Sequence, residues 1–92
     1  MWTVLESRAA SKALDKAPAE IVRKFHAWAE IVQQSGPQGV RAIRGFHDEP
    51  LAGEWSGFRS SRLGLQWRVI YKVEANQVMV HVVRVTPHDY RR

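Results

Sequence analysis

Residues 58–86, FRSSRLGLQWRVIYKVEANQVMVHVVRVT, contain three strand-like runs in direct succession. The runs cover residues 58–63, 66–73 and 77–86, and the second and third are rich in β-branched and aromatic residues. Gly64 and the segment 74–76 separate them, and both separators are short enough for antiparallel hairpins. The stretch therefore predicts a three-stranded antiparallel meander.

Alternation in the second run gives its two faces different characters. Successive side chains of a strand point to opposite faces, which puts one apolar set together: Trp67, Val69, Tyr71 and Val73. Arg68, Ile70 and Lys72 point the other way, so one face is dry and the other partly basic. Antiparallel pairing across the turn also places Arg68 beside the end of the third run, next to the tail VTPHDY.

The chain upstream of the meander predicts a strand and two helices. Residues 2–5, WTVL, are short and apolar, which indicates a first strand. Residues 7–34 are rich in Ala, Lys, Glu and Gln, and Pro18 divides them because proline is tolerated only in the first turn of a helix. The second helix carries an apolar stripe at helical spacing: Ile21, Phe25, Trp28 and Val32.

Glycine and proline mark the end of the helical part. Gly36-Pro37 predicts a helix stop, and residues 37–57, with four Gly and two Pro, read as a surface loop. The predicted class is α+β, with an N-terminal strand and a helical hairpin packed on an antiparallel sheet. The helices cover one side of this sheet, and the other side is left for a ligand.

Length and composition indicate one small domain over residues 1–92. There is no cysteine, which fits a reducing interior, and the N-terminus resembles neither a signal peptide nor a membrane span, so we expect a cytoplasmic protein. The charge is uneven, because residues 57–92 carry seven Lys or Arg against two acids, a net charge of +5. Such an excess favours a polyanion or an acidic protein as partner.

Metal and cofactor chemistry have no signature in the sequence, because no His, Asp or Glu cluster has ligand spacing and no Gly-rich loop precedes a helix. We expect no metal and no cofactor. A metal-free ribonuclease needs a base for the ribose 2′-hydroxyl, cations for the phosphate and an acid for the leaving oxygen. Arginine suits the cation role, since its planar fork pairs with phosphate and keeps its charge.

The candidate site residues come from the strands and from the tail. They are Arg59, Arg62, Arg68 and Lys72 in the meander, and His88, Tyr90, Arg91 and Arg92 after it. Histidine ordinarily titrates near neutral pH, so His88 suits acid–base work. Each has an ordinary reading as well: the arginines as solvated strand charges, His88 and the tail as exposed terminal residues.

The order of strand, helical hairpin and meander, together with LAGEWSGFRSSRLGLQWRVIYKVE and then VRVTPHDY, resembles the RelE/ParE superfamily of bacterial type II toxins. The resemblance covers essentially the whole chain and implies a RelE-like fold. One departure is that the first strand of the meander carries arginines where the best-known RelE pattern has a lysine pair. Because arginine does not readily act as a base, that duty shifts towards His88 or stays open.

The resemblance implies a ribosome-dependent endoribonuclease that cuts mRNA and is neutralised by an antitoxin protein. It implies that Arg68 contacts the scissile phosphate and that Arg59 and Arg62 hold the RNA backbone. His88 would transfer a proton or stabilise charge, and Tyr90 would orient or stack on a base. The antitoxin is expected to lay an acidic, partly disordered segment over the basic sheet.

Two other functions remain open from the sequence. Toxins of the ParE kind share the fold but inhibit DNA gyrase. A plain RNA-binding or ribosome-binding module would use the same cations to hold phosphate without cutting it. Arg68 together with the His-x-Tyr tail favours the nuclease over both.

Overall fold

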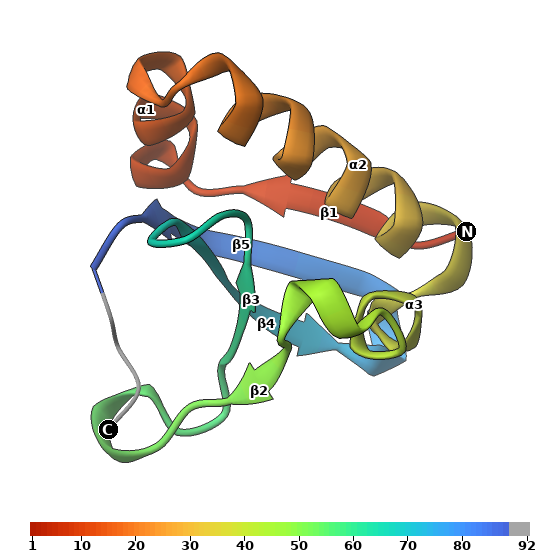
Figure 1. Cartoon of the computed structure of the whole chain (residues 1–92). Coiled ribbons are helices and arrows are strands. Elements are labelled where there is room, and N and C mark those ends of the chain that lie inside the picture. The colour runs from red at the N-terminus through yellow and green to blue at the C-terminus, as the bar shows by residue number, and fades with distance from the viewer. Residues whose placement is uncertain (89–92) are drawn as a thin grey trace.

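The structure, a computed structural model, describes residues 1–88 (Figure 1). Its strands are β1 Thr3–Glu6, β2 Glu49–Pro50, β3 Arg59–Arg62, β4 Arg68–Glu74 and β5 Met79–Thr86. Its α-helices are α1 Arg8–Lys16, α2 Ala19–Ser35 and α3 Pro37–Arg41, and three 3₁₀ turns complete it: η1 Arg44–Phe46, η2 Gly53–Trp55 and η3 Ala75–Gln77. The predicted α+β class is confirmed.

The strands form one mixed sheet in the order β1-β5-β4-β3-β2. The antiparallel β3-β4-β5 meander is confirmed, and the predicted N-terminal strand, β1, joins the same sheet by parallel pairing with β5. The predicted loop over residues 37–57 is also too simple, since it contains β2 at the sheet edge. A two-residue strand that includes Pro50 shows no alternation, and an edge is where a sheet tolerates proline.

The predicted division at Pro18 is confirmed, and local hydrogen bonds explain where the helices begin and end. Ser7 Oγ accepts from the Ala10 N–H at 3.0 Å, which caps α1, and donates to the Val83 carbonyl at 2.8 Å. Gly36 ends α2 with φ of +75°, and a Cβ there would lie 2.7 Å from the Trp2 indole nitrogen, so only glycine fits. Pro37 then starts α3 rather than the expected loop, since proline suits a first helical turn.

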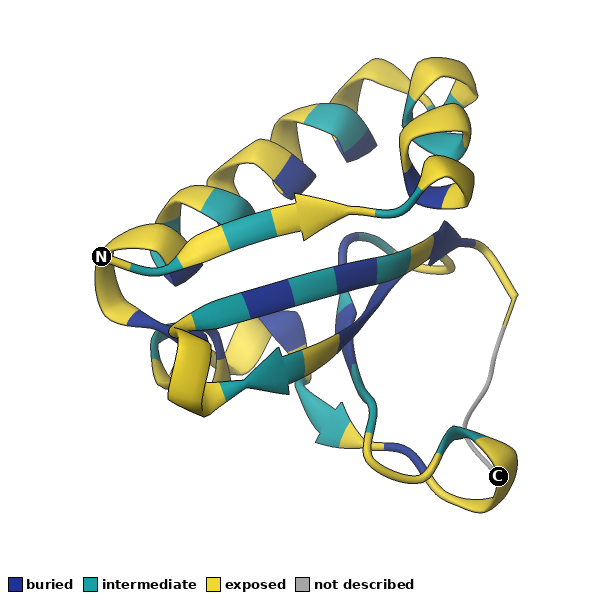
Figure 2. Cartoon of the chain, turned by 180° about the vertical axis from the view of Figure 1, so that it is seen from behind, coloured by how far each residue is buried: buried dark blue, intermediate teal, exposed yellow. Residues whose placement is uncertain are grey.

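The core lies between α2 and one face of the sheet. The predicted stripe of Ile21, Phe25, Trp28 and Val32 is fully buried. It packs on the apolar side of β4, where the Trp28 and Tyr71 rings meet edge to face at 5.1 Å. Figure 2 shows the helices turning their buried residues towards the sheet. No helix within residues 1–88 is long and apolar enough to cross a membrane.

Candidate functional site

The side chains on the sheet face opposite α2 are ordered in rows by the strand register. We call this the open face. One row contains Arg62, Arg68 and Thr86; the next contains Glu49, Ser60, Ile70 and Arg84; a third contains Lys72 and His81. A bulge at Val83 keeps Arg84 and Thr86 on this face, because the register shifts between Ile70 and Tyr71. The predicted basic face of β4 is thus part of a surface built by four strands.

Arg62 and Arg68 stand directly opposite each other in the first row. Like charges at this spacing repel each other, so the pairing of two arginines favours an anion close to them. Arg68 is 6% exposed, and Arg62 is half-buried. Among the described residues, Arg62 Nε is buried and finds no hydrogen-bond partner. The pair has the composition and placement of an anion site, and the bidentate geometry of guanidinium suits phosphate.

The end of β5 and His88 lie beside Arg68, as the sequence predicts. Thr86 pairs with Arg68, and the His88 N–H donates to Thr86 Oγ1 at 3.1 Å. His88 is exposed and lies two residues beyond the strand partner of Arg68. Tyr90, Arg91 and Arg92, the other candidates from the tail, lie outside the described residues.

Arg59 lies on the opposite side of the sheet from Arg62 and Arg68. Its Nε donates to Asp48 Oδ1 at 2.6 Å, and the Asp48 side chain is 0% exposed. Burial alone would lower the pKa of Arg59, but the hydrogen bond and charge of Asp48 raise it overall. The structure therefore does not bring Arg59 together with the other two arginines, and its first partner is a buried carboxylate.

Asp48 is the centre of a buried network on the helix side. Ser61 Oγ and the Tyr71 hydroxyl both donate to Asp48 Oδ2, at 2.6 and 2.5 Å. Ser61 Oγ in turn accepts from Trp28 Nε1 at 3.0 Å. Burial and the Asp48 carboxylate both raise the pKa of Tyr71 well above its ordinary value. The network ties α2, β3 and β4 to the segment before β2.

Glu49 is a possible site residue that sequence reasoning missed. It pairs with Ser60 on the open face, one row from Arg62, whereas its neighbour Asp48 points to the helix side. It is half-buried. No pattern could reveal it, because a strand of two residues carries no period and the segment reads as a loop. The open face thus contains a carboxylate as well as cations.

Lys72, predicted to contact RNA, lies in the third row and is exposed. Its Nζ is 5.7 Å from the centroid of the Phe58 ring, which is within the range of a cation–π contact. Phe58 is the residue before β3 and is itself half-buried. We call the row of Arg62, Arg68 and Thr86 the arginine row. The open face therefore extends from the arginine row to Lys72, whose ammonium group lies over an aromatic ring.

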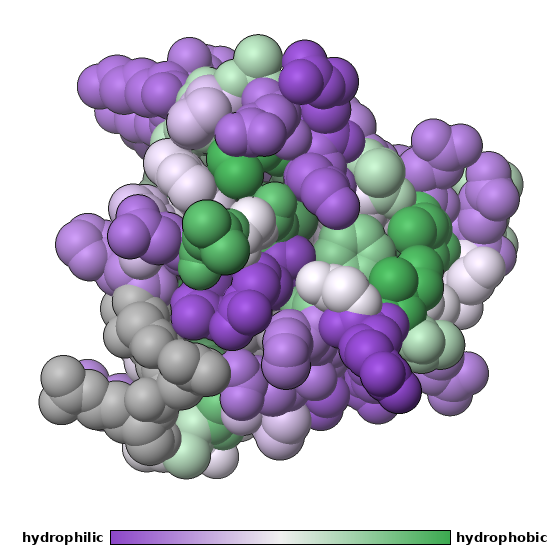
Figure 3. All heavy atoms as spheres, viewed as in Figure 1, coloured by the Kyte–Doolittle hydropathy of each residue, from purple (hydrophilic) through white to green (hydrophobic). Residues whose placement is uncertain are grey.

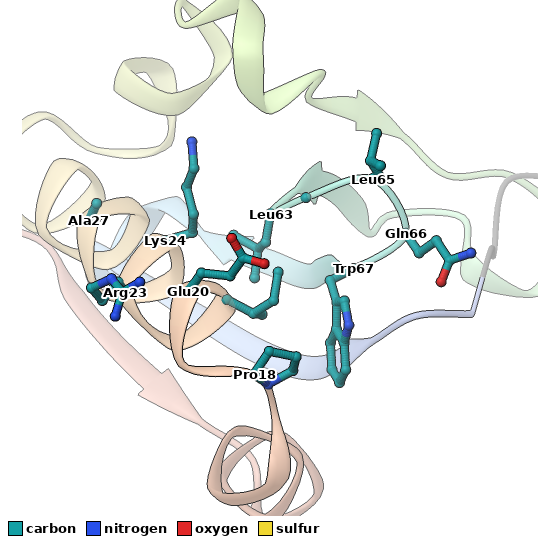
Figure 4. A pocket seen from close by; sticks show the side chains of 11 residues that line it. Pro18, Glu20, Arg23, Lys24, Ala27, Leu63, Leu65, Gln66 and Trp67 are labelled. Atoms are coloured by element: carbon teal, nitrogen blue, oxygen red, sulfur yellow. The ribbon is translucent and has the colours of Figure 1, made fainter.

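A groove of about 750 Å³ lies between α2 and the turn that joins β3 to β4. Trp67 and Leu63 form its sheet side, and Pro18, Glu20 and Lys24 form its helix side (Figure 4). Figure 3 shows hydrophilic and hydrophobic groups side by side on one face of the molecule. The groove carries none of the candidate site residues, so the groove and the row of Arg62 and Arg68 are separate features.

The open face brings together cations, a carboxylate and an imidazole. Arg62 and Arg68 pair in one row, the carboxylate of Glu49 lies one row away, and the imidazole of His88 follows the strand that completes the row. Within residues 1–88, no three His, Asp or Glu side chains lie close enough to hold a metal ion.

Comparisons with known proteins give a fold match. No protein-family model and no curated protein sequence matches the chain. Among solved structures, the toxin–antitoxin complex RelBE2 from Mycobacterium tuberculosis is 26% identical with a TM-score of 0.71, covering 98% of this chain and 91% of that one. The archaeal RelE–RelB complex from Pyrococcus horikoshii is 25% identical with a TM-score of 0.74, covering 94% and 93%.

A third match is more distant in sequence but as close in shape. The YoeB/ParE toxin from Agrobacterium tumefaciens is 17% identical with a TM-score of 0.76, covering 95% of this chain and 99% of that one. The strand, helical hairpin and meander are thus shared by toxins of several kinds. The resemblance that the sequence indicates is confirmed, and the chain has the fold of the RelE/ParE superfamily of toxin–antitoxin toxins.

Proposed function

We propose that the chain is the toxin of a type II toxin–antitoxin system and acts in the cytoplasm as a ribosome-dependent endoribonuclease on mRNA. The observation that carries this proposal is the direct opposition of Arg62 and Arg68 on the open face. A phosphodiester that binds at this pair meets two guanidinium groups at once, and each of them can donate to its non-bridging oxygens. The structural similarity to toxins in toxin–antitoxin complexes supports the proposed role as a toxin.

The reaction is an attack of the ribose 2′-hydroxyl on the adjacent phosphorus. A base takes the 2′-hydroxyl proton, the new P–O bond forms, and the bond from phosphorus to the 5′-oxygen of the next nucleotide breaks. An acid gives that oxygen its proton. The products are a 2′,3′-cyclic phosphate and a free 5′-hydroxyl, and no metal or cofactor enters the balance.

The roles follow from position on the open face. Arg68 and Arg62 hold the non-bridging oxygens, where negative charge builds up in the transition state. His88 takes part in proton transfer, and Glu49, one row from Arg62, is its proposed counterpart. Lys72 contacts the RNA backbone further along the strand. Tyr90, Arg91 and Arg92 keep their sequence-based assignments as an orienting aromatic and as phosphate contacts. Arg59 has no RNA contact in this proposal, because it binds Asp48 on the other side of the sheet.

Brief induction of the chain in cells, followed by mapping of new mRNA ends, tests the proposal. The unsubstituted chain is expected to arrest growth and to produce cuts within translated mRNA. Arg68→Ala and His88→Ala are expected to lose both effects while ribosome binding is largely kept. Glu49→Gln tests the carboxylate in the same way. If the Arg68→Ala and His88→Ala variants both still cut mRNA, the catalytic assignment is wrong.

The two alternatives predict different outcomes in the same cells. A gyrase inhibitor of the ParE kind would cause DNA breaks without loss of mRNA. A module that binds RNA without cutting would arrest growth with mRNA intact, and the arrest would survive His88→Ala. Growth arrest with cut mRNA and intact DNA is the result expected here.

An antitoxin protein is the proposed partner, because toxin–antitoxin complexes are among the structures that share this fold. An acidic segment of such a partner would complement the arginine row and Lys72. Binding there would also cover the groups proposed for catalysis. The matching test is co-expression with the product of the adjacent gene, which is expected to bind the unsubstituted chain more tightly than an Arg62→Glu variant.

A further inference from the structure

A small aromatic cluster, Trp55 and Phe58, lies beside Lys72 at the open face. The Trp55 and Phe58 rings meet edge to face, with centroids 5.2 Å apart and planes at 78°. Lys72 Nζ lies over Phe58 at 5.7 Å. We call Trp55, Phe58 and Lys72 the aromatic platform.

The backbone of the loop before β3 holds the platform in place. The Leu51 N–H donates to the Phe58 carbonyl at 2.9 Å, which closes the loop, and the Phe58 N–H donates to the Trp55 carbonyl at 3.0 Å. Gly57 has φ of +93°, a conformation that other residues rarely adopt, and this turn brings the two rings together. The rings are therefore positioned before any ligand arrives, which lowers the entropic cost of binding.

Core packing does not explain these aromatic residues. Trp28 is buried in the cluster between α2 and the sheet, and Trp2 and Trp67 pack against that cluster, whereas Trp55 and Phe58 belong to neither group. Both keep part of their surface exposed. A half-exposed aromatic pair with a lysine beside it is the composition of sites that stack bases and neutralise phosphates in single-stranded nucleic acid.

The aromatic platform lies close enough to the arginine row for one RNA strand to contact both. Lys72 lies four residues from Arg68 on the same strand and the same face, a span of roughly 13 Å for an extended strand. A short piece of extended RNA can cover that span. A strand held at its phosphate by Arg62 and Arg68 can thus reach the platform with a nearby nucleotide.

We propose that the aromatic platform binds a nucleobase flanking the scissile linkage and gives the nuclease a preference for a purine at that position. The larger purine ring covers more of the Trp55 and Phe58 surface than a pyrimidine does, while Lys72 holds the adjoining phosphate. This inference rests on the proposed nuclease function. It adds a specificity-determining site that is separate from the groups that move protons.

Cleavage-end mapping with platform variants tests the inference. The unsubstituted chain is expected to show a purine preference at one position near the cut. Trp55→Leu and Phe58→Leu are expected to flatten that preference and to slow cleavage about 10-fold, as the loss of one stacking contact does. Phe58→Tyr keeps the ring and should keep the preference. Lys72→Gln should slow cleavage without changing the preferred base, and Lys24→Gln on α2 is the matched control with no effect.

The outcomes separate the two proposals. If the unsubstituted chain cuts no mRNA, the nuclease function fails and this inference fails with it. If the unsubstituted chain cuts, and the Trp55→Leu or Phe58→Leu variant retains a melting temperature near that of the parent and cuts with an unchanged base profile, the inference alone is wrong. An unsubstituted chain that cuts without any base preference near the cut overturns it as well.

Discussion

The two arginines at the ends of β3 stand on opposite faces of one sheet and have opposite surroundings. Arg59, on the helix side, donates to a buried carboxylate that also binds Ser61 and Tyr71. Arg62, on the open face, stands opposite Arg68, another cation. The same side chain, three residues apart, is compensated by the fold in one place and left facing a like charge in the other. The comparison separates a charge that a buried carboxylate of the protein neutralises from a charge that faces another cation.

The strand period explains why these environments can lie so close together. Residues of odd number in β3 point towards α2 and residues of even number point away, so a shift of three positions changes the face. On the helix side the polar groups form a closed network around Asp48. On the open face, Ser60 Oγ and Arg62 Nε are buried and find no hydrogen-bond partner among the described residues. Substitutions on the two sides should therefore have opposite effects on stability and activity.

The largest expected effect is on activity and comes from the open face. Arg68→Ala should lower the rate of mRNA cleavage by about 10²- to 10³-fold, because it removes a donor that stabilises the transition-state charge. The rate is measured on a defined mRNA in a reconstituted translation reaction. Thermal unfolding of the same preparation checks that the protein is folded. Cleavage within 3-fold of the parent in a folded Arg68→Ala protein would contradict the assignment.

The next effect is on stability and comes from the helix side. Asp48→Ala removes the acceptor shared by Arg59, Ser61 and Tyr71, and the loss of one partner from a buried ion pair should cost about 3 kcal/mol. Urea unfolding followed by tryptophan fluorescence measures it. Asp15→Ala on the exposed surface of α1 is the control and should change stability by less than about 0.5 kcal/mol. Equal effects at the two aspartates would show that the network adds nothing.

Tyr71→Phe should cost less, about 1 to 2 kcal/mol, because it deletes one hydrogen bond and keeps the ring against Trp28. It should also change the response to alkali. The pKa of Tyr71 is raised in the folded chain, so above about pH 10 the unfolded chain loses this proton first, and stability falls as pH rises. Unfolding curves between pH 8 and 11 should show a shallower decline in the variant. If stability declines equally steeply with pH in the variant and in the parent, another group controls the loss of stability at alkaline pH.

The sequence predicts those parts of the fold whose residues repeat with a period. The stripe from Ile21 to Val32, the division at Pro18 and the alternation in β4 all rest on local chemistry, and the structure confirms them. The place of β1 beside β5 and the existence of β2 do not follow from any local pattern. Both depend on pairing between distant segments, and Glu49–Pro50 is too short to show a period at all.

The site was predicted in part for the same reason. Antiparallel pairing correctly placed Arg68 beside the end of β5, and with it the residues that lead to His88. Alternation in β3 could have shown that Arg59 shares a face with the buried Leu63 and not with Arg62, since odd and even positions separate there. Asp48 could not have been assigned to Arg59, because that contact joins a loop to a strand through side chains alone.

The smallest expected effect tests the comparison most directly. Arg62→Gln removes one of two facing positive charges, so it should raise the free energy of unfolding by a few tenths of a kcal/mol, up to about 1 kcal/mol. Arg62→Lys keeps the charge and should show no such gain. The difference between the two variants should shrink in high salt, because screening weakens repulsion between partly exposed groups. If Arg62→Gln is instead less stable than Arg62→Lys at low salt, then the charge of Arg62 is compensated within the fold, as the charge of Arg59 is on the other face.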